Sequence, residues 1–147
     1  AVAGPAWKSA AGKLLSRLKP NFALPTDLDA ALLTNDQAVV DAYRVDSLVH
    51  GKASSRWFTE VQKAHREVVE QAPKVTLPIL IMQGADDEIV DIQATRKVAG
   101  TVGSEDRHYI EYQGLKHEIF NEVERQKVYT DMTSWLQERG LWNCADA

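Results

Sequence analysis

Two residues, Asp87 and His117, have types and positions that suit acid–base chemistry. Asp87 follows a compact apolar segment over 76–83, and His117 follows a second strand-like segment over 107–112. If these segments pair as parallel strands about 4.8 Å apart, short loops at their carboxyl ends bring the carboxylate and the imidazole together. A carboxylate that accepts from one imidazole nitrogen fixes the tautomer, and the other nitrogen then takes a proton from a nucleophile. The sequence therefore predicts two of the three members of a catalytic triad.

The segments around this pair predict a unit of parallel strands and connecting helices. The expected order is a strand over 76–83, a polar loop over 84–91, a helix over 92–102, a strand over 107–112, a loop over 113–117 and a last helix. The first strand is apolar without alternation, which is typical of a central strand that is buried on both faces. A helix between two strands makes them parallel through a right-handed crossover. Two such strands cannot bury both faces of a sheet, so we expect further strands that the sequence does not contain.

Two finer features concern the second strand and the last helix. His108, Ile110 and Tyr112 should share one face of the strand, because side chains alternate along it. Asn121 and Glu124 have the spacing of a capping box, so the last helix is predicted to begin at Asn121.

Residues 1–75 are predicted to form several helices and no strand, because their apolar positions follow a helical period. The clearest helix covers 54–71, with Ser54 or Ser55 as its cap and apolar residues at steps of three or four. Its amphipathic pattern predicts that one face packs on another part of the protein.

Composition indicates an ordinary globular protein and excludes several classes of function. Of the 147 residues, 44% are hydrophobic and 26% are charged, and the net charge of -4 without a basic cluster argues against nucleic-acid binding. The longest apolar stretch, Ile79–Met82, is too short to span a membrane, and residues 1–10 do not have the pattern of a secretory signal. A single cysteine, Cys144, allows no internal disulfide framework and fits a reducing, cytoplasmic location.

The nucleophile of the expected triad is missing from the sequence. No G-x-S-x-G turn occurs, although such a turn exposes the serine of many hydrolases and helps to build the oxyanion hole. The serines without this context are Ser9, Ser16, Ser47, Ser54, Ser55, Ser104 and Ser134. We therefore expect the nucleophile to lie outside this chain and the chain alone to be inactive.

No metal or organic cofactor is expected. The acidic cluster Asp86, Asp87, Glu88 and Asp91 does not have the alternating ligands and central glycine of an EF-hand loop. The other histidines, His50, His65 and His108, do not have the spacing of a helical zinc pair, so they are interpreted as surface or partly buried residues.

Two motifs carry a resemblance to a known family. LPILIMQGADDEIV over 77–90 resembles the acid-bearing strand and loop of α/β-hydrolases. GLKHEIFNE over 114–122 is similar to the histidine loop of the monoacylglycerol lipase and lysophospholipase branch, and the order acid then histidine matches the family order. Upstream, DQAVVDAY over 36–43 and SSRWF over 54–58 resemble the helical cap of that branch. The resemblance covers nearly the whole chain.

The resemblance implies an α/β fold: the C-terminal portion of an α/β-hydrolase, with a helical cap over 1–75 and the last two parallel strands and flanking helices of the core over 76–147. The family places its catalytic aspartate three residues after the glycine, which selects Asp87, with Asp86 as the alternative. Gln83 stands where many relatives have histidine and is interpreted as a packing or loop-bonding residue. The implied activity of the parent protein is hydrolysis of a monoacylglycerol, a lysophospholipid or a similar acyl ester.

Two alternatives remain at this point. The apolar residues Leu24, Leu28, Leu32, Leu33, Trp57 and Phe58 could line an acyl pocket under the cap, although amphipathic core packing explains such patterns more often. The chain could also be a non-catalytic interaction or structural module that binds another chain through its open sheet edge. In either case, the expected partner at this edge is the missing N-terminal half or another chain.

Overall fold

The computed structural model describes residues 6–26 and 28–142 of the chain. The first part of the chain contains α1 (Ala6–Leu18), β1 (Ala23–Pro25), the 3-10 helix η1 (Ala30–Leu32), α2 (Gln37–Val45), β2 (Lys52–Ser54), α3 (Ser55–Gln71) and η2 (Ala72–Lys74). The second part contains β3 (Ile79–Gly84), α4 (Ile92–Thr101), β4 (Arg107–Tyr112), η3 (Ile119–Asn121) and α5 (Arg125–Glu138). Cys144 lies outside the described residues.

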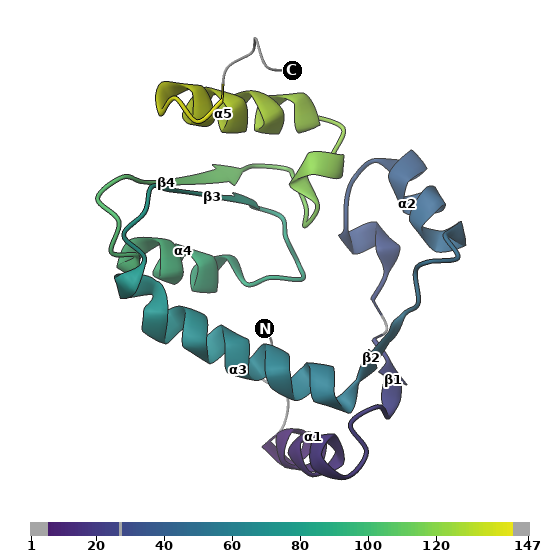
Figure 1. Ribbon diagram of the computed structural model, residues 1–147. Coiled ribbons are helices and arrows are strands. Elements are labelled where there is room, and N and C mark those ends of the chain that lie inside the picture. The colour runs from purple at the N-terminus through teal and green to yellow at the C-terminus, as the bar shows by residue number, and fades with distance from the viewer. Residues whose placement is uncertain (1–5, 27, 143–147) are drawn as a thin grey trace.

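The second part forms the predicted unit of two parallel strands with helices on both faces. β3 pairs with β4 in a parallel register that runs from Ile79 opposite Arg107 to Gly84 opposite Tyr112. α5 covers one face of this sheet and α4 the other (Figure 1). Among the described residues β3 has β4 as its only strand partner, so the central position expected for β3 is not seen within this chain.

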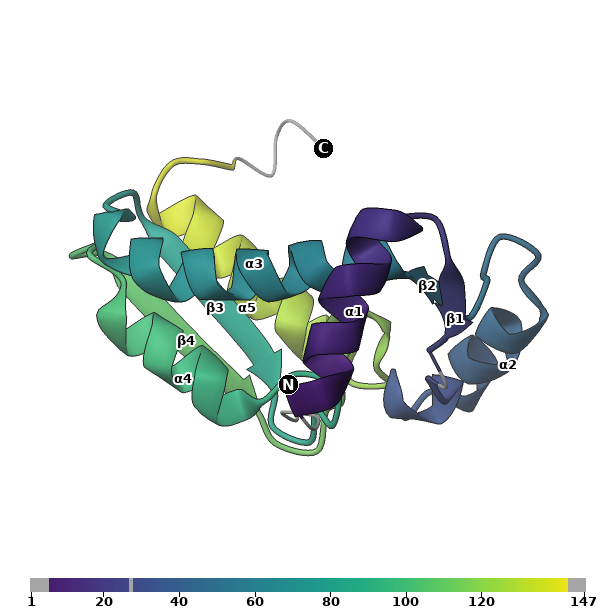
Figure 2. The same ribbon diagram turned by 90° about the horizontal axis from the view of Figure 1, so that it is seen from below.

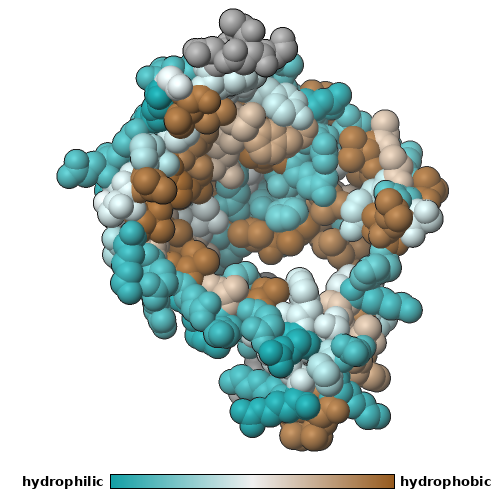
Figure 3. Space-filling model, in the orientation of Figure 1, coloured by the Kyte–Doolittle hydropathy of each residue, from teal (hydrophilic) through white to brown (hydrophobic). Residues whose placement is uncertain are grey.

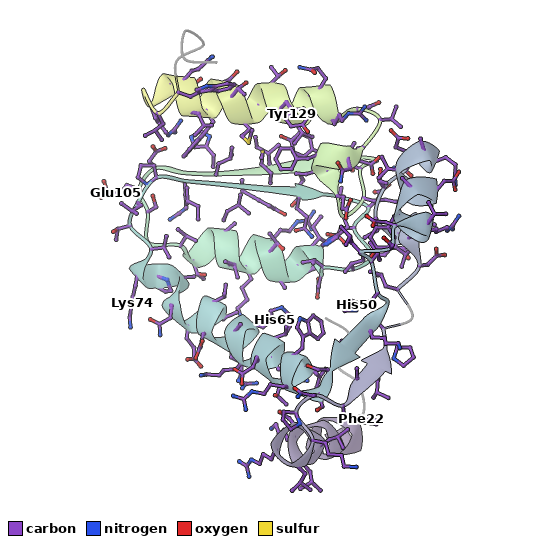
Figure 4. The ribbon with its side chains drawn as sticks, turned by 45° about the vertical axis from the view of Figure 1, so that its right-hand side comes forward. Phe22, His50, His65, Lys74, Glu105 and Tyr129 are labelled. Atoms are coloured by element: carbon purple, nitrogen blue, oxygen red, sulfur yellow. The ribbon has the colours of Figure 1, made fainter. Side chains whose placement is uncertain are left out.

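Side chains of β4 alternate between the two helices, as the sequence predicts. Ile110 and Tyr112 pack toward α5, in a core that includes the fully buried Val128. Glu111 points to the other face, where its two carboxylate oxygens each accept a bond of 2.6 Å from Arg96 of α4. On the α5 side, the Tyr129 hydroxyl donates to the carbonyl of Phe120 at 3.2 Å, which ties α5 to η3 (Figure 4).

The first part contains the predicted helices, and α1 packs on α3 (Figure 2). The Ser54 hydroxyl caps α3 by accepting from the backbone N–H of Trp57 at 3.1 Å. The prediction that 1–75 contains no strand is wrong, because β1 and β2 pair in antiparallel fashion, with Ala23 opposite Ser54. Each of these strands has three residues, which is too short for an alternating pattern to be visible in the sequence.

The last helix begins later than predicted. Asn121 ends η3 instead of capping α5, and Glu124 precedes the first residue of α5 without a side-chain capping bond. Between them, the chain turns so that the side chain of Glu122 points into the protein and is 1% exposed. The capping-box interpretation is therefore wrong, since tertiary bonds hold these residues in a different turn.

No helix in the described part of the chain combines the length and the apolar character that crossing a membrane requires.

Candidate active site

The loop after β3, residues 85–91, carries Asp87, and we call it the acid loop. The Asp87 side chain is 3% exposed. Its Oδ1 accepts from the backbone N–H groups of Ile89 at 2.8 Å and Val90 at 2.9 Å. These two bonds fix the orientation of the carboxylate and leave Oδ2 for another partner.

The loop after β4, residues 113–118, carries His117 to that second oxygen, and we call it the histidine loop. The Nδ1 atom of His117 lies 3.0 Å from Oδ2 of Asp87. Because a carboxylate only accepts, Nδ1 carries the hydrogen and donates. The His117 side chain is 34% exposed, and no side chain or backbone group of the described residues is bonded to its other nitrogen, Nε2.

The electrostatics of the pair favour an ionised aspartate. Burial alone raises the pKa of the Asp87 carboxyl, but the bonds from His117, Val90 and Ile89 outweigh it and hold the pKa below its ordinary value. Asp87 is therefore a carboxylate at neutral pH. In this state it keeps the neutral imidazole in the tautomer with a bare Nε2 and stabilises the imidazolium that forms when Nε2 takes a proton.

Gln83, the last residue but one of β3, is bonded to the acid loop. Its Nε2 donates to the carbonyl of Val90 at 3.0 Å and to Oδ2 of Asp87 at 3.3 Å. The expectation that Gln83 is a loop-bonding residue agrees with these contacts. Its direct bond to Asp87 was not evident from the sequence, because nothing in the residue types shows which side chain faces the carboxylate.

The two loops approach each other closely because Gly84 has no side chain. A Cβ atom at Gly84 would overlap the backbone carbonyl oxygens of Leu115 and Lys116. Two backbone bonds hold the acid loop here. The N–H of Ala85 donates to the carbonyl of Tyr112, at the end of β4, at 2.8 Å, and the N–H of Asp86 donates to the carbonyl of Leu115, in the histidine loop, at 3.0 Å. The separation between Asp87 and His117 therefore depends on this backbone contact.

The other residues considered from the sequence lie elsewhere. Asp86 has an exposed side chain and is not bonded to His117 in the described residues. His50 and His65 are exposed, beside β2 and on α3 (Figure 4), and His108 is exposed on β4. No serine hydroxyl is bonded to His117 among the described residues. No cluster of three or more His, Cys, Asp or Glu that could hold a metal ion occurs there either.

An apolar groove of about 1420 Å³ lies beside the acid loop, and Ile89 of that loop is one of its lining residues. Apolar side chains gather around the hollow at the centre of this face (Figure 3). Leu24, Leu28, Trp57 and Phe58 line the groove and are 38 to 55% exposed. In the described residues these four are thus open to the groove rather than buried in a core, whereas Leu33 is buried against Ala30 and Val40.

Comparison with known proteins shows the family of the chain. The model of the family described as serine aminopeptidase S33 matches residues 1–124. The chain belongs to this family. It is 34% identical over 128 residues to a monoacylglycerol lipase of Mycolicibacterium smegmatis, which covers 86% of this chain and 45% of that protein. It is also 35% identical over 120 residues to phospholipase YtpA of Bacillus subtilis, covering 81% of this chain and 46% of that protein.

The fold is similar to that of a solved enzyme. The crystal structure of the Paleococcus ferrophilus monoacylglycerol lipase matches with a TM-score of 0.77 and 28% identity, over 90% of this chain and 52% of that one. The chain thus spans about half the length of each of these three relatives. The expected fold class, the C-terminal portion of an α/β-hydrolase in the monoacylglycerol lipase branch, is confirmed.

The lowered pKa of Asp87 leads to a prediction for stability. Above the ordinary pKa of 3.8 the carboxylate contributes its full stabilisation, and this is lost as pH falls through the lower value of the folded state. Replacing Asp87 with Asn should therefore cost about 1–3 kcal/mol at pH 7, because a buried acceptor is removed. The cost should be smaller at pH 3. Urea unfolding of the wild type and of Asp87→Asn, at pH 7 and at pH 3, measures this difference in the free energy of unfolding. An equal difference at the two pH values would contradict the bonds assigned to Asp87.

Proposed function

We propose that this chain supplies the acid and the base of a serine hydrolase that cleaves carboxylic esters, with Asp87 and His117 in these roles. The observation that carries the proposal is the 3.0 Å contact between Nδ1 of His117 and Oδ2 of the buried Asp87 at the carboxyl edge of two parallel strands. The nucleophile is a serine outside this chain. Residues 1–75 act as the helical cap, and residues 76–147 form the C-terminal part of the catalytic core.

The proposed reaction uses His117 twice. Nε2 takes the proton of the serine hydroxyl as the serine oxygen attacks the ester carbonyl, and Asp87 stabilises the resulting imidazolium. When the tetrahedral intermediate collapses, the same nitrogen gives its proton to the leaving alcohol, and an acyl-enzyme remains. Water then attacks the acyl-enzyme with His117 again as base, and the acid is released with the serine restored.

The proposed substrates are esters with one long acyl chain, such as monoacylglycerols or lysophospholipids. The groove beside the acid loop supports this choice, because its apolar lining suits an alkyl chain and Ile89 brings it next to Asp87. The names of two relatives, a monoacylglycerol lipase and a phospholipase, agree with the proposal.

The assignment of the base is tested in the full-length protein with His117→Ala. Ester turnover should fall by about 10³-fold or more, because no other group takes the proton of the nucleophile. The matched control is His108→Ala, which removes an exposed imidazole from β4 and should leave turnover unchanged. The 147-residue chain alone should show no turnover in the same assay. Full activity of His117→Ala, with the control also active, would rule out His117 as the base.

The acyl groove is tested with Trp57→Ala, which removes an aromatic lining residue that is 55% exposed. In the full-length protein, kcat/KM for a long-chain ester should fall by about 10-fold because apolar contact area is lost, while a short-chain ester should be affected little. Leu48→Ala is the control, because Leu48 is 87% exposed and is not among the lining residues of the groove. An equal loss of kcat/KM for the long-chain and the short-chain ester would show that the groove does not bind the acyl chain.

A further inference from the structure

Glu122 is an acidic side chain inside the protein to which the proposed reaction gives no role. It is 1% exposed. Its Oε1 accepts from the backbone N–H of Lys116 at 2.7 Å and from the side-chain amide of Asn35 at 3.2 Å, and its Oε2 accepts from the backbone N–H of Asn35 at 2.9 Å. In the described part of the chain, N–H groups rather than a cation satisfy this carboxylate.

The two partners of Glu122 belong to different parts of the protein. Lys116 immediately precedes His117 in the histidine loop, whereas Asn35 lies between η1 and α2. Asn35 also donates from its side chain to the carbonyl of Gly114 at 2.8 Å, so it holds the histidine loop at a second point. Glu122 is thus the only described side chain that accepts from both the Lys116 backbone and Asn35.

Further hydrogen bonds join residues 33–35 to the region of the histidine loop. The Thr34 hydroxyl, itself 1% exposed, donates to the carbonyl of Asn121 at 3.0 Å. The N–H of Glu118, on the other side of His117, donates to the carbonyl of Leu33 at 2.7 Å. The histidine loop is therefore tied to residues 33–35 both before and after His117.

A buried carboxylate is costly unless all of its bonds are made, and its loss leaves buried N–H groups without partners. Here the groups left without a partner would be two backbone N–H groups, one of which is next to His117. A neutral amide in place of the carboxylate keeps the size of the side chain but accepts at only one atom, so its NH₂ group would face an N–H donor.

We propose that Glu122 is a positioning residue: its carboxylate locks the histidine loop to residues 33–35 and so fixes the ring of His117 against Asp87. This proposal rests on the role of His117 as the base. By this proposal, the segment around η1 and α2 also helps to position the catalytic site. A shift of that segment would move Lys116, because Glu122 is bonded to both.

The kinetic test uses Glu122→Gln in the full-length protein, with Glu124→Gln as the matched control. Glu124 is exposed and makes no side-chain capping bond, so the same change there should leave turnover unchanged. For Glu122→Gln we expect kcat to fall by about 10-fold or more with KM within twofold, since a misplaced base slows chemistry without changing the acyl groove. An unchanged kcat, or a loss that only follows the unfolded fraction, would overturn the proposal.

Hydrogen–deuterium exchange on peptides covering 113–118 supplies a readout that does not depend on turnover. In Glu122→Gln the exchange of this loop should speed up by about 10-fold while the core peptides of β3 and β4 stay protected. A lower kcat with unchanged exchange in the loop would also overturn the proposal.

A second variant, Asn35→Ala, keeps the proposal testable if Glu122→Gln does not fold. Asn35→Ala changes an exposed residue and removes the side-chain bonds to Glu122 and Gly114, so a smaller loss of kcat, about threefold, should accompany faster exchange of the loop. Wild-type exchange and kcat in this variant would contradict the proposal. If His117→Ala kept its activity while Glu122→Gln loosened the loop, the proposed function would fail but the structural hold of Glu122 on the loop would stand.

Discussion

The candidate site depends on the parallel pairing of β3 with β4. The register places Gly84 opposite Tyr112, so both strands end at the same level and their loops leave the sheet side by side. Gly84 then allows the backbone of the histidine loop to lie against the end of β3. Asp87 is the third residue after Gly84, and His117 is the fifth residue after Tyr112. Because of the backbone contact, these short loops bring Nδ1 of His117 to 3.0 Å from Oδ2 of Asp87.

Two buried carboxylates complete this arrangement, and both are satisfied by N–H donors. Asp87 accepts from two backbone N–H groups, from Gln83 and from His117, so its burial does not neutralise it and its pKa is lowered. Glu122 accepts from Lys116 and Asn35 on the other side of the histidine loop. The histidine loop is thus held from two directions, by the acid loop and by residues 33–35.

The sequence predicted the features that depend on local pattern and on motifs. The apolar run of β3, the alternation in β4 and the helical period of α3 are visible in short windows, and the two motifs selected Asp87 and His117, which the structure brings together. It did not predict the pairing of β1 with β2 or the inward turn of Glu122. Both features depend on contacts between residues that are distant in the sequence. The spacing of Asn121 and Glu124 is that of a capping box, but tertiary bonds override this local pattern.

The tautomer of His117 is the most direct test of the central claim, that Asp87 orients this imidazole as a base. Long-range proton–nitrogen correlation spectra of the nitrogen-15-labelled chain report which ring nitrogen carries the hydrogen. In the neutral ring, Nδ1 should carry the hydrogen and be bonded to Asp87, and Nε2 should be bare. A protonated Nε2, or rapid averaging between the two tautomers as in a free imidazole, would contradict it.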